Sequence, residues 1–168
     1  APTIKLKGNI TTALDPHTNA ATTDDDAASI DLNGAVVVDA DITLDSGNGT
    51  IDFSGALDST ADAANSLTID GGSGTTTFNG AIGTATSGSS TKGALGTLTV
   101  NTGTETGDIT FATNADIGTN TVAGASRILV GNGATGTLAL NGSFYTSSGG
   151  DSTTAAQIYT ANAFTMGG

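Results

Sequence analysis

The sequence predicts an all-β protein whose strands stack as a parallel β-solenoid of about six short rungs. A phrase recurs along the chain with the pattern apolar, any, apolar, any, then usually Gly or Asn, a small residue and an apolar one. Gly and Thr are abundant and disfavour helices, and strict alternation outweighs any helical spacing of apolar residues. Each repeat is too small to bury its own apolar face, so neighbouring repeats must cover one another.

The repeats are irregular in length. The clearest copy is Leu67–Thr84, where Leu67–Asp70 alternates, a glycine turn follows, and Thr76–Phe78 alternates again. Three other stretches follow this plan: Ile42–Ser59, Leu98–Thr119 and Ile128–Ser147. Copies of the second strand begin at Ile4, Ile30, Ile51, Thr76, Ile109, Leu138 and Ile158. Their spacing, roughly 20 to 33 residues, lies in the range of stacked architectures.

A second architecture also fits these strands. In an antiparallel β-sandwich, such as a jelly-roll filament subunit, Leu67–Phe78 would form a hairpin across Gly71–Gly74. Variable spacing and the recurrent Asn-Gly after the strand favour the solenoid, because Gly and Asn tolerate the positive φ that its corners require.

Residues 1–12 are expected to form an N-terminal strand. Lys5 and Lys7 lie on its polar face, where lysine protects an exposed strand edge from unwanted pairing. Its apolar face is formed by Ile4, Leu6 and Ile10. A polar, acidic loop at 13–28 follows and leaves this strand on a tether. The strand is therefore a candidate assembly strand, donated to a sheet edge of a neighbouring subunit.

Residues 29–168 are expected to form the β domain built from the repeats. Val36–Val38 is β-branched, and Ile42 and Leu44 then alternate with polar residues, which indicates one buried face. Irregular segments at 60–66 and 85–97 interrupt the pattern, and such insertions map to loops in a solenoid.

Composition restricts the classes of partner. The formal net charge is −12 with 4 Lys and Arg in total, so binding to nucleic acid is not expected, since phosphate contacts need cationic side chains. No apolar run is long enough to span a bilayer. The chain has no Cys, which excludes disulfides and thiolate metal sites. It begins Ala-Pro-Thr, compatible with removal of a secretion signal, and we expect an extracellular or cell-surface location.

The phrases GTIDFSGALDS, GTTTFNGAIGT and ALGTLTVNTGTETGDITF resemble the β-strand repeats of filamentous-haemagglutinin-like and autotransporter-type bacterial surface proteins. The resemblance covers roughly residues 29–147. It implies an extracellular β-solenoid with a structural or adhesive role and carries no catalytic residues over. Such adhesins contain many more repeats than this chain.

Catalytic chemistry is not expected. His17 is the only histidine and lies in a polar loop, and sugar-stacking aromatic residues are scarce. A calcium ion is the cofactor hypothesis, because carboxylate and carbonyl oxygens at turns suit it. The residues proposed for it are the cluster Asp24, Asp25 and Asp26 and the ladder Asp39, Asp41 and Asp45. A solvated acidic face is the alternative interpretation.

Three Asn-x-Ser/Thr sequons predict glycosylation sites at Asn9, Asn48 and Asn141. In a chain rich in Asn and Thr, such sequons also arise by chance.

Together these features predict a secreted, non-enzymatic structural protein. The first hypothesis is a self-assembling subunit of an extracellular filament or surface layer, whose partners are copies of itself or neighbouring repeats. The alternative is a repeat segment of a large adhesin that binds host or surface glycans. A third hypothesis is a polysaccharide lyase or hydrolase built on a solenoid.

Overall fold

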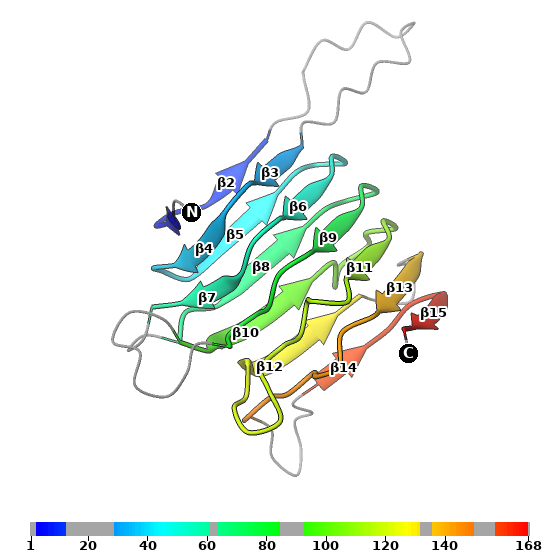
Figure 1. Ribbon diagram of the computed structural model, residues 1–168. Coiled ribbons are helices and arrows are strands. Elements are labelled where there is room, and N and C mark those ends of the chain that lie inside the picture. The colour runs from blue at the N-terminus through cyan, green and yellow to red at the C-terminus, as the bar shows by residue number, and fades with distance from the viewer. Residues whose placement is uncertain are drawn as a thin grey trace, which may run out of the picture.

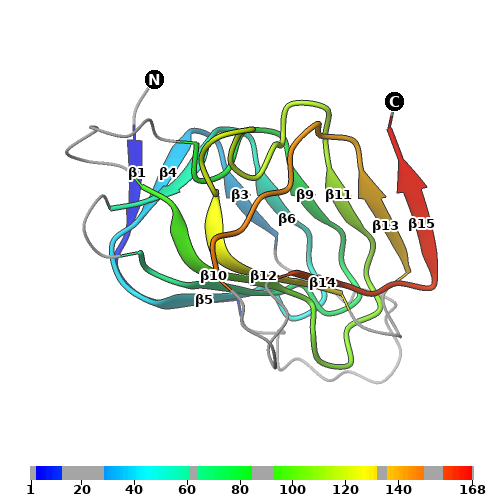
Figure 2. The same ribbon diagram turned by 90° about the horizontal axis from the view of Figure 1, so that it is seen from below.

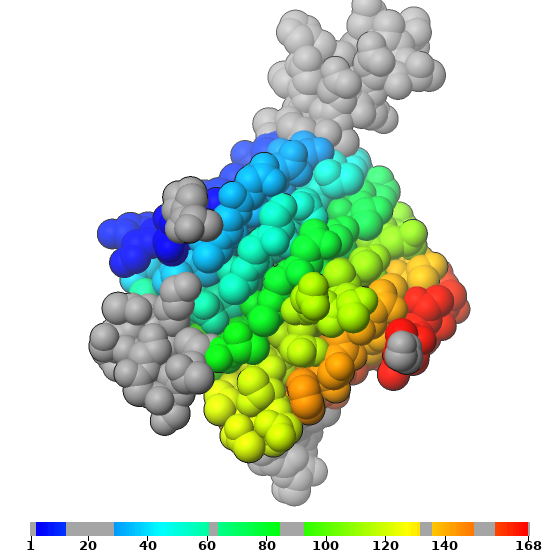
Figure 3. All heavy atoms as spheres, viewed as in Figure 1, coloured from blue at the N-terminus to red at the C-terminus, as the bar shows by residue number. Residues whose placement is uncertain are grey.

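The computed structural model describes residues 3–12, 29–60, 64–84, 93–131, 136–149 and 157–167. These residues form a parallel β-solenoid without helices, as the repeat pattern predicts. In Figure 1 the strands stack in sequence order from the blue N-terminal end to the red C-terminal end. The same order appears as parallel bands across the surface in Figure 3.

Three parallel sheets, here called A, B and C, form the faces of the coil. Sheet A consists of β1 (Thr3–Leu6), β4 (Ala35–Val38) and β7 (Leu57–Ser59). Sheet B consists of β2 (Ile10–Thr11), β5 (Ile42–Asp45), β8 (Leu67–Asp70), β10 (Leu95–Val100), β12 (Ala125–Val130) and β14 (Gln157–Tyr159). Sheet C consists of β3 (Ile30–Leu32), β6 (Ile51–Phe53), β9 (Thr76–Phe78), β11 (Ile109–Phe111), β13 (Thr137–Leu140) and β15 (Ala163–Met166).

The chain passes from sheet A to sheet B to sheet C and then begins the next rung (Figure 2). All pairs between named strands are parallel, so the hairpin of the sandwich alternative does not form. After β7 the face of sheet A continues as single parallel bridges from Leu57 to Ile82, from Ile82 to Ile117 and from Ile117 to Tyr145. Each face therefore runs the length of the described coil.

Most of the predicted repeat register is confirmed. Five copies pair in one column of sheet C: Ile30, Ile51, Thr76, Ile109 and Leu138. The first and last copies were placed wrongly, because Ile4 pairs with Val36 in sheet A and Ile158 pairs with Leu129 in sheet B. Every face needs the same inward–outward alternation, so the motif alone does not identify the face to which a strand belongs.

The core consists of apolar columns that run along the coil. Within sheet C, Phe53, Phe78 and Phe111 occupy the same position in successive strands and are all buried. Their rings are stacked, with centroids 5.0 Å apart for the first pair and 4.7 Å apart for the second. The rings follow the spacing of parallel strands, about 4.8 Å, so backbone pairing and aromatic packing are satisfied together.

The corner between sheets B and C is built by a repeated turn. After β5, Asp45 Oδ1 accepts a hydrogen bond of 2.8 Å from the Gly47 amide; after β8, Asp70 Oδ1 accepts one of 3.2 Å from the Gly72 amide. Both glycines have positive φ, of 66° and 55°. A Cβ on Gly72 would lie 1.7 Å from the Gly47 carbonyl oxygen. At this position the two corners approach backbone to backbone, which only glycine permits.

We predict that Phe78→Ala lowers the free energy of unfolding by about 3–5 kcal/mol, because it leaves a cavity in the middle of the ring stack. Urea titration followed by circular dichroism measures the change. Thr77→Ala, on the outward side of the same strand, is the control and should change stability by no more than about 0.5 kcal/mol. Equal losses for the two variants would contradict the packing role of the stack.

We also predict that Gly72→Ala destabilises the protein by about 1–3 kcal/mol, since it combines positive φ with a backbone clash against the preceding corner. The matched control is Gly8→Ala, because an added Cβ on Gly8 meets no atom within 4 Å. Thermal unfolding of both variants tests the difference. An unchanged melting temperature for Gly72→Ala would show that successive corners do not need this close approach.

Candidate functional site

The residues of the predicted assembly strand lie in the first rung of the solenoid. Ile4 pairs with Val36, and Leu6 with Val38, through the β1–β4 ladder. Ile10 pairs with Leu44 through the β2–β5 ladder. The N-terminal strand is therefore paired in cis within a single chain. Its surface available to a partner is the outer edge of β1 and β2, to which no described strand is paired.

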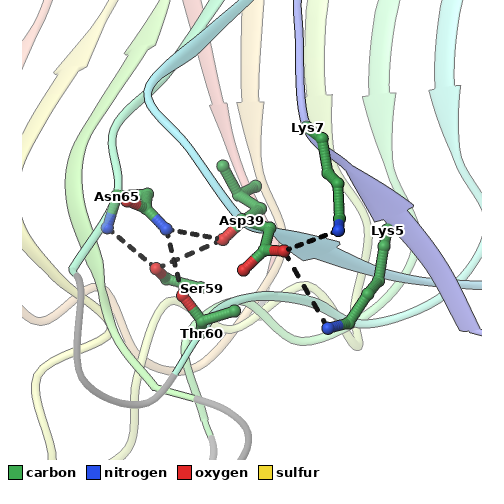
Figure 4. Close-up of polar contacts among 7 residues, drawn as sticks. Lys5, Lys7, Asp39, Ser59, Thr60 and Asn65 are labelled. Atoms are coloured by element: carbon green, nitrogen blue, oxygen red, sulfur yellow. Dashed lines mark hydrogen bonds and ion pairs between the residues drawn. The ribbon is translucent and has the colours of Figure 1, made fainter.

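Lys5 and Lys7 lie close to Asp39, which follows β4 (Figure 4). Their Nζ atoms are 3.9 Å and 3.7 Å from Asp39 Oδ2. Both lysine side chains are largely exposed, so each ion pair contributes little to stability. The two lysines place positive charge beside the Asp39 carboxylate.

The residues of the calcium hypothesis are not gathered into one site among the described parts of the chain. Asp24, Asp25 and Asp26 lie outside the described residues. Within the described ranges no group of three His, Cys, Asp or Glu side chains is placed to hold a metal ion.

The three aspartates of the predicted ladder each have a separate role. Asp39 pairs with the lysines, Asp41 Oδ1 accepts a hydrogen bond of 2.7 Å from the Ser66 amide, and Asp45 shapes its own turn. The alternation of Asp along this stretch therefore reflects corner chemistry at different positions of the coil.

The sequon asparagines also contact neighbouring rungs. Asn9 Oδ1 accepts a hydrogen bond of 2.8 Å from the Thr43 amide, and Asn48 Oδ1 accepts one of 3.1 Å from the Ser73 amide. Both residues are exposed, whereas Asn141 is half-buried. Exposure therefore favours Asn9 and Asn48 over Asn141 as glycan acceptors.

At several corners a side-chain oxygen accepts a hydrogen bond from a backbone amide of the following rung. The sequence analysis did not identify these residues. Asp108 Oδ1 accepts a hydrogen bond of 2.7 Å from the Thr137 amide, and Asp116 Oδ1 accepts hydrogen bonds from the amides of Ser143 and Phe144. Asn101 instead bonds to the preceding rung, where its Oδ1 accepts a hydrogen bond of 2.9 Å from the Gly71 amide. Asn101 is fully buried and has a φ of 47°. The sequence signal that could have identified these residues is an Asp or Asn directly beside a predicted strand.

An acidic hollow of about 210 Å³ lies at the corner after β8. Asp70 and Glu105 line it together with Asn48, Ser73 and Thr104. Burial raises the pKa of Asp70, the Gly72 amide opposes this shift, and the charges of Glu105 and Asp45 add to it. Asp45 and Asp70 are register partners, so two like charges stand opposite each other on neighbouring strands.

The two ends of the solenoid differ in the exposure of their apolar side chains. In sheet C, Ile30 and Leu32 of the first strand are only 5% and 6% exposed. Phe164 and Met166 occupy the same two columns in the last strand and are 49% and 74% exposed. Ile158, on the last strand of sheet B, is 44% exposed because it continues the outward column of Leu129 and does not belong to the core. Phe164 and Met166 therefore form an exposed apolar surface at the C-terminal end of the described coil. It lies beside the outer edges of β14 and β15, to which no described strand is paired.

Comparisons with family models, curated proteins and solved structures find no match to this chain. The resemblance to bacterial surface repeats therefore stays a prediction. Of the residues that the structure describes, none belongs to a helix long and apolar enough to cross a bilayer.

We predict that Asp70→Asn increases stability near neutral pH by about 0.2–0.5 kcal/mol, because it removes a carboxylate whose charged form is disfavoured first by burial and then by the charges of Glu105 and Asp45. Asn keeps the Oδ1 acceptor for the Gly72 amide. The pKa of Asp70 is raised in the fold, so the folded state binds its proton more tightly than the unfolded state. Wild-type stability therefore falls as pH rises from the unfolded pKa through the folded one.

The measurement is urea unfolding of both proteins at pH 3 and pH 7. The advantage of Asp70→Asn should be present at pH 7, shrink at pH 3 and weaken in high salt. A difference between the two proteins that is the same at both pH values would contradict the electrostatic explanation.

Proposed function

We propose that this chain is a secreted structural protein, a subunit of an extracellular filament or surface layer that assembles by β-strand addition. The observation that carries the proposal is the exposure of Phe164 and Met166 beside edges of β14 and β15 to which no described strand is paired. Free parallel edges are templates for pairing with another chain. An exposed apolar surface beside them adds the driving force of burial.

The N-terminal end offers the matching feature. The outer edges of β1, β2 and β3 are unpaired to any described strand, and the strands have the same direction as those at the other end. Because the pairing is parallel throughout, a second copy can continue all three faces without reversing direction. Repeat folds depend on contacts between neighbouring units, so the joint can use the same interactions as the interior.

We predict that purified protein forms unbranched fibres of uniform width whose amount rises with protein concentration and with salt. The salt dependence follows from the net charge of −12, since copies repel one another and ions screen that repulsion over about 10 Å at 0.1 M. Negative-stain electron microscopy and sedimentation velocity across a concentration series measure assembly. Monomers alone at every concentration and salt level would overturn the proposal.

A second candidate, a glycan-binding adhesin segment, is favoured by one feature of sheet C. Ser54 Oγ lies 3.1 Å from Asn33 Oδ1 and 2.9 Å from Asp52 Oδ2. Asn79 Nδ2 donates a hydrogen bond of 2.8 Å to Asp52 Oδ1. This ladder of amide, hydroxyl and carboxylate groups borders a shallow hollow of about 360 Å³ that is lined partly by Asn33 and Ser54. Such groups suit the hydroxyls of a sugar.

The adhesin candidate is tested on a glycan array with monomeric protein. Binding that is lost in Asn33→Ala and retained in Thr110→Ala, which changes an outward residue elsewhere on sheet C, would support it. An array without binding would remove it.

A further inference from the structure

We propose that Asn79 is a deamidation site, at which the backbone nitrogen of Gly80 attacks the asparagine side chain and converts it to aspartate or isoaspartate. The reaction is independent of the filament function proposed above. Four Asn-Gly steps lie in the described parts of the chain, at 33–34, 48–49, 79–80 and 141–142. A fifth, at 132–133, lies outside them. The hydrogen bonds of the four described steps single out Asn79.

The reaction needs no reagent besides water. Gly80 N loses its proton to solvent and attacks Asn79 Cγ, so that the N–Cγ bond forms, the Cγ–Nδ2 bond breaks, and the side-chain nitrogen takes up a proton and leaves as ammonia. Water then hydrolyses the cyclic imide at one of its two carbonyl carbons. Cleavage at Cγ gives aspartate, and cleavage at the backbone carbon gives isoaspartate. No atom is oxidised or reduced. Glycine favours the attack because it has no Cβ to obstruct the approach.

The glycine amide is engaged at three of the four described steps. It donates a hydrogen bond from Gly34 to the Leu32 carbonyl at 3.0 Å, from Gly49 to the Ser46 carbonyl at 3.0 Å, and from Gly142 to the Tyr145 hydroxyl at 2.9 Å. The amide proton must leave before the nitrogen can attack, so each of these bonds has to break first. These bonds therefore protect Asn33, Asn48 and Asn141.

Gly80 is the exception, because its amide donates to no acceptor among the described residues. The preceding amide, that of Asn79, donates a hydrogen bond of 2.9 Å to the Phe53 carbonyl, so Asn79 is anchored on its N-terminal side only. Asn79 is exposed, and water reaches its side chain. That side chain is held through its leaving nitrogen, since Nδ2 donates a hydrogen bond of 2.8 Å to Asp52 Oδ1. The attacking nitrogen is thus unengaged.

Deamidation to aspartate changes the outward face of sheet C. Asn79 Nδ2 is the donor in the contact with Asp52, and an aspartate at position 79 has no such donor. Two carboxylates would then meet on neighbouring rungs, where like charges are destabilising. The modification therefore replaces an attractive contact by a repulsive one.

Isoaspartate has a larger effect, because it lengthens the backbone by one carbon atom directly before Gly80. A Cβ built on Gly80 lies 2.4 Å from the carbonyl carbon and oxygen of Gly55. One built on Gly55 lies 2.5 Å from the same two atoms of Gly34. Three successive corners between sheets C and A therefore stack backbone on backbone, and a longer backbone in one of them does not fit this spacing.

Incubation of the folded protein in mildly alkaline buffer tests the site, with peptide mapping by mass spectrometry to follow the conversion of amide to acid. A hydrogen bond that must break first slows the attack by about two- to tenfold. Asn79 should therefore react about two- to tenfold faster than Asn33, Asn48 and Asn141. In urea that unfolds the protein, all four should react at similar rates, because they share the same two-residue step.

Two results of this experiment would overturn the proposal. One is a rate at Asn79 in the folded protein that does not exceed the rates at the other three asparagines. The other is an equally strong preference for Asn79 in urea, which would show that the fold does not select it.

A variant that frees an engaged amide tests the cause of the selectivity. Tyr145→Phe removes the hydroxyl that accepts the Gly142 amide and keeps the ring, so deamidation of Asn141 should accelerate by about two- to tenfold. The matched control is Tyr159→Phe, since the Tyr159 hydroxyl bonds to Gln157 Oε1 and to no glycine amide. Circular dichroism checks that both variants keep the fold. An unchanged rate at Asn141 in Tyr145→Phe would contradict protection by the hydrogen bond.

The effect of the modification on the fold is tested with Asn79→Asp, the product of hydrolysis at Cγ. Its urea midpoint should be lower than that of the wild type. The double variant Asp52→Asn with Asn79→Asp exchanges donor and acceptor across the same contact and should recover most of the loss. A midpoint for Asn79→Asp equal to that of the wild type would show that aspartate at this position leaves the coil undisturbed.

Discussion

Each rung of this protein is positioned by the parallel backbone ladder that it forms with the rung before it. That ladder sets the spacing of the side chains that stack along the coil. The rings of Phe53, Phe78 and Phe111 lie 5.0 Å and 4.7 Å apart because parallel strands are about 4.8 Å apart. It also dictates the corners. Where Gly72 passes over Gly47, two turns must fit at strand spacing, and the Cβ of any other residue would collide.

The dependence on spacing explains where the acidic residues are. Fifteen of the sixteen carboxylates belong to aspartate, the exception being Glu105, and the short aspartate side chain reaches a backbone amide at a turn. Asp41, Asp108 and Asp116 each accept a hydrogen bond from the following rung, so they fasten corners that carry no strand ladder. The positions of these three aspartates are thus a consequence of how the coil turns.

Sequence periodicity identified the solenoid and the register of its central rungs, because an inward residue in one strand must match an inward residue in the next. It could not assign the end copies to faces, since Ile4 and Ile158 carry an alternation that sheets A, B and C share. It also interpreted Asp39, Asp41 and Asp45 as one ladder. Distances between corners depend on how the chain bends after Val38 and Asp45, and a linear pattern carries no such information.

The ends of the coil follow from the same physics as its middle. An interior strand such as β11 has both edges paired and both apolar side chains covered, by β9 below and β13 above. The last strand, β15, has only one such neighbour among the described strands, so Phe164 and Met166 stay exposed. Adding a rung to this end costs no new kind of interaction and no reversal of direction.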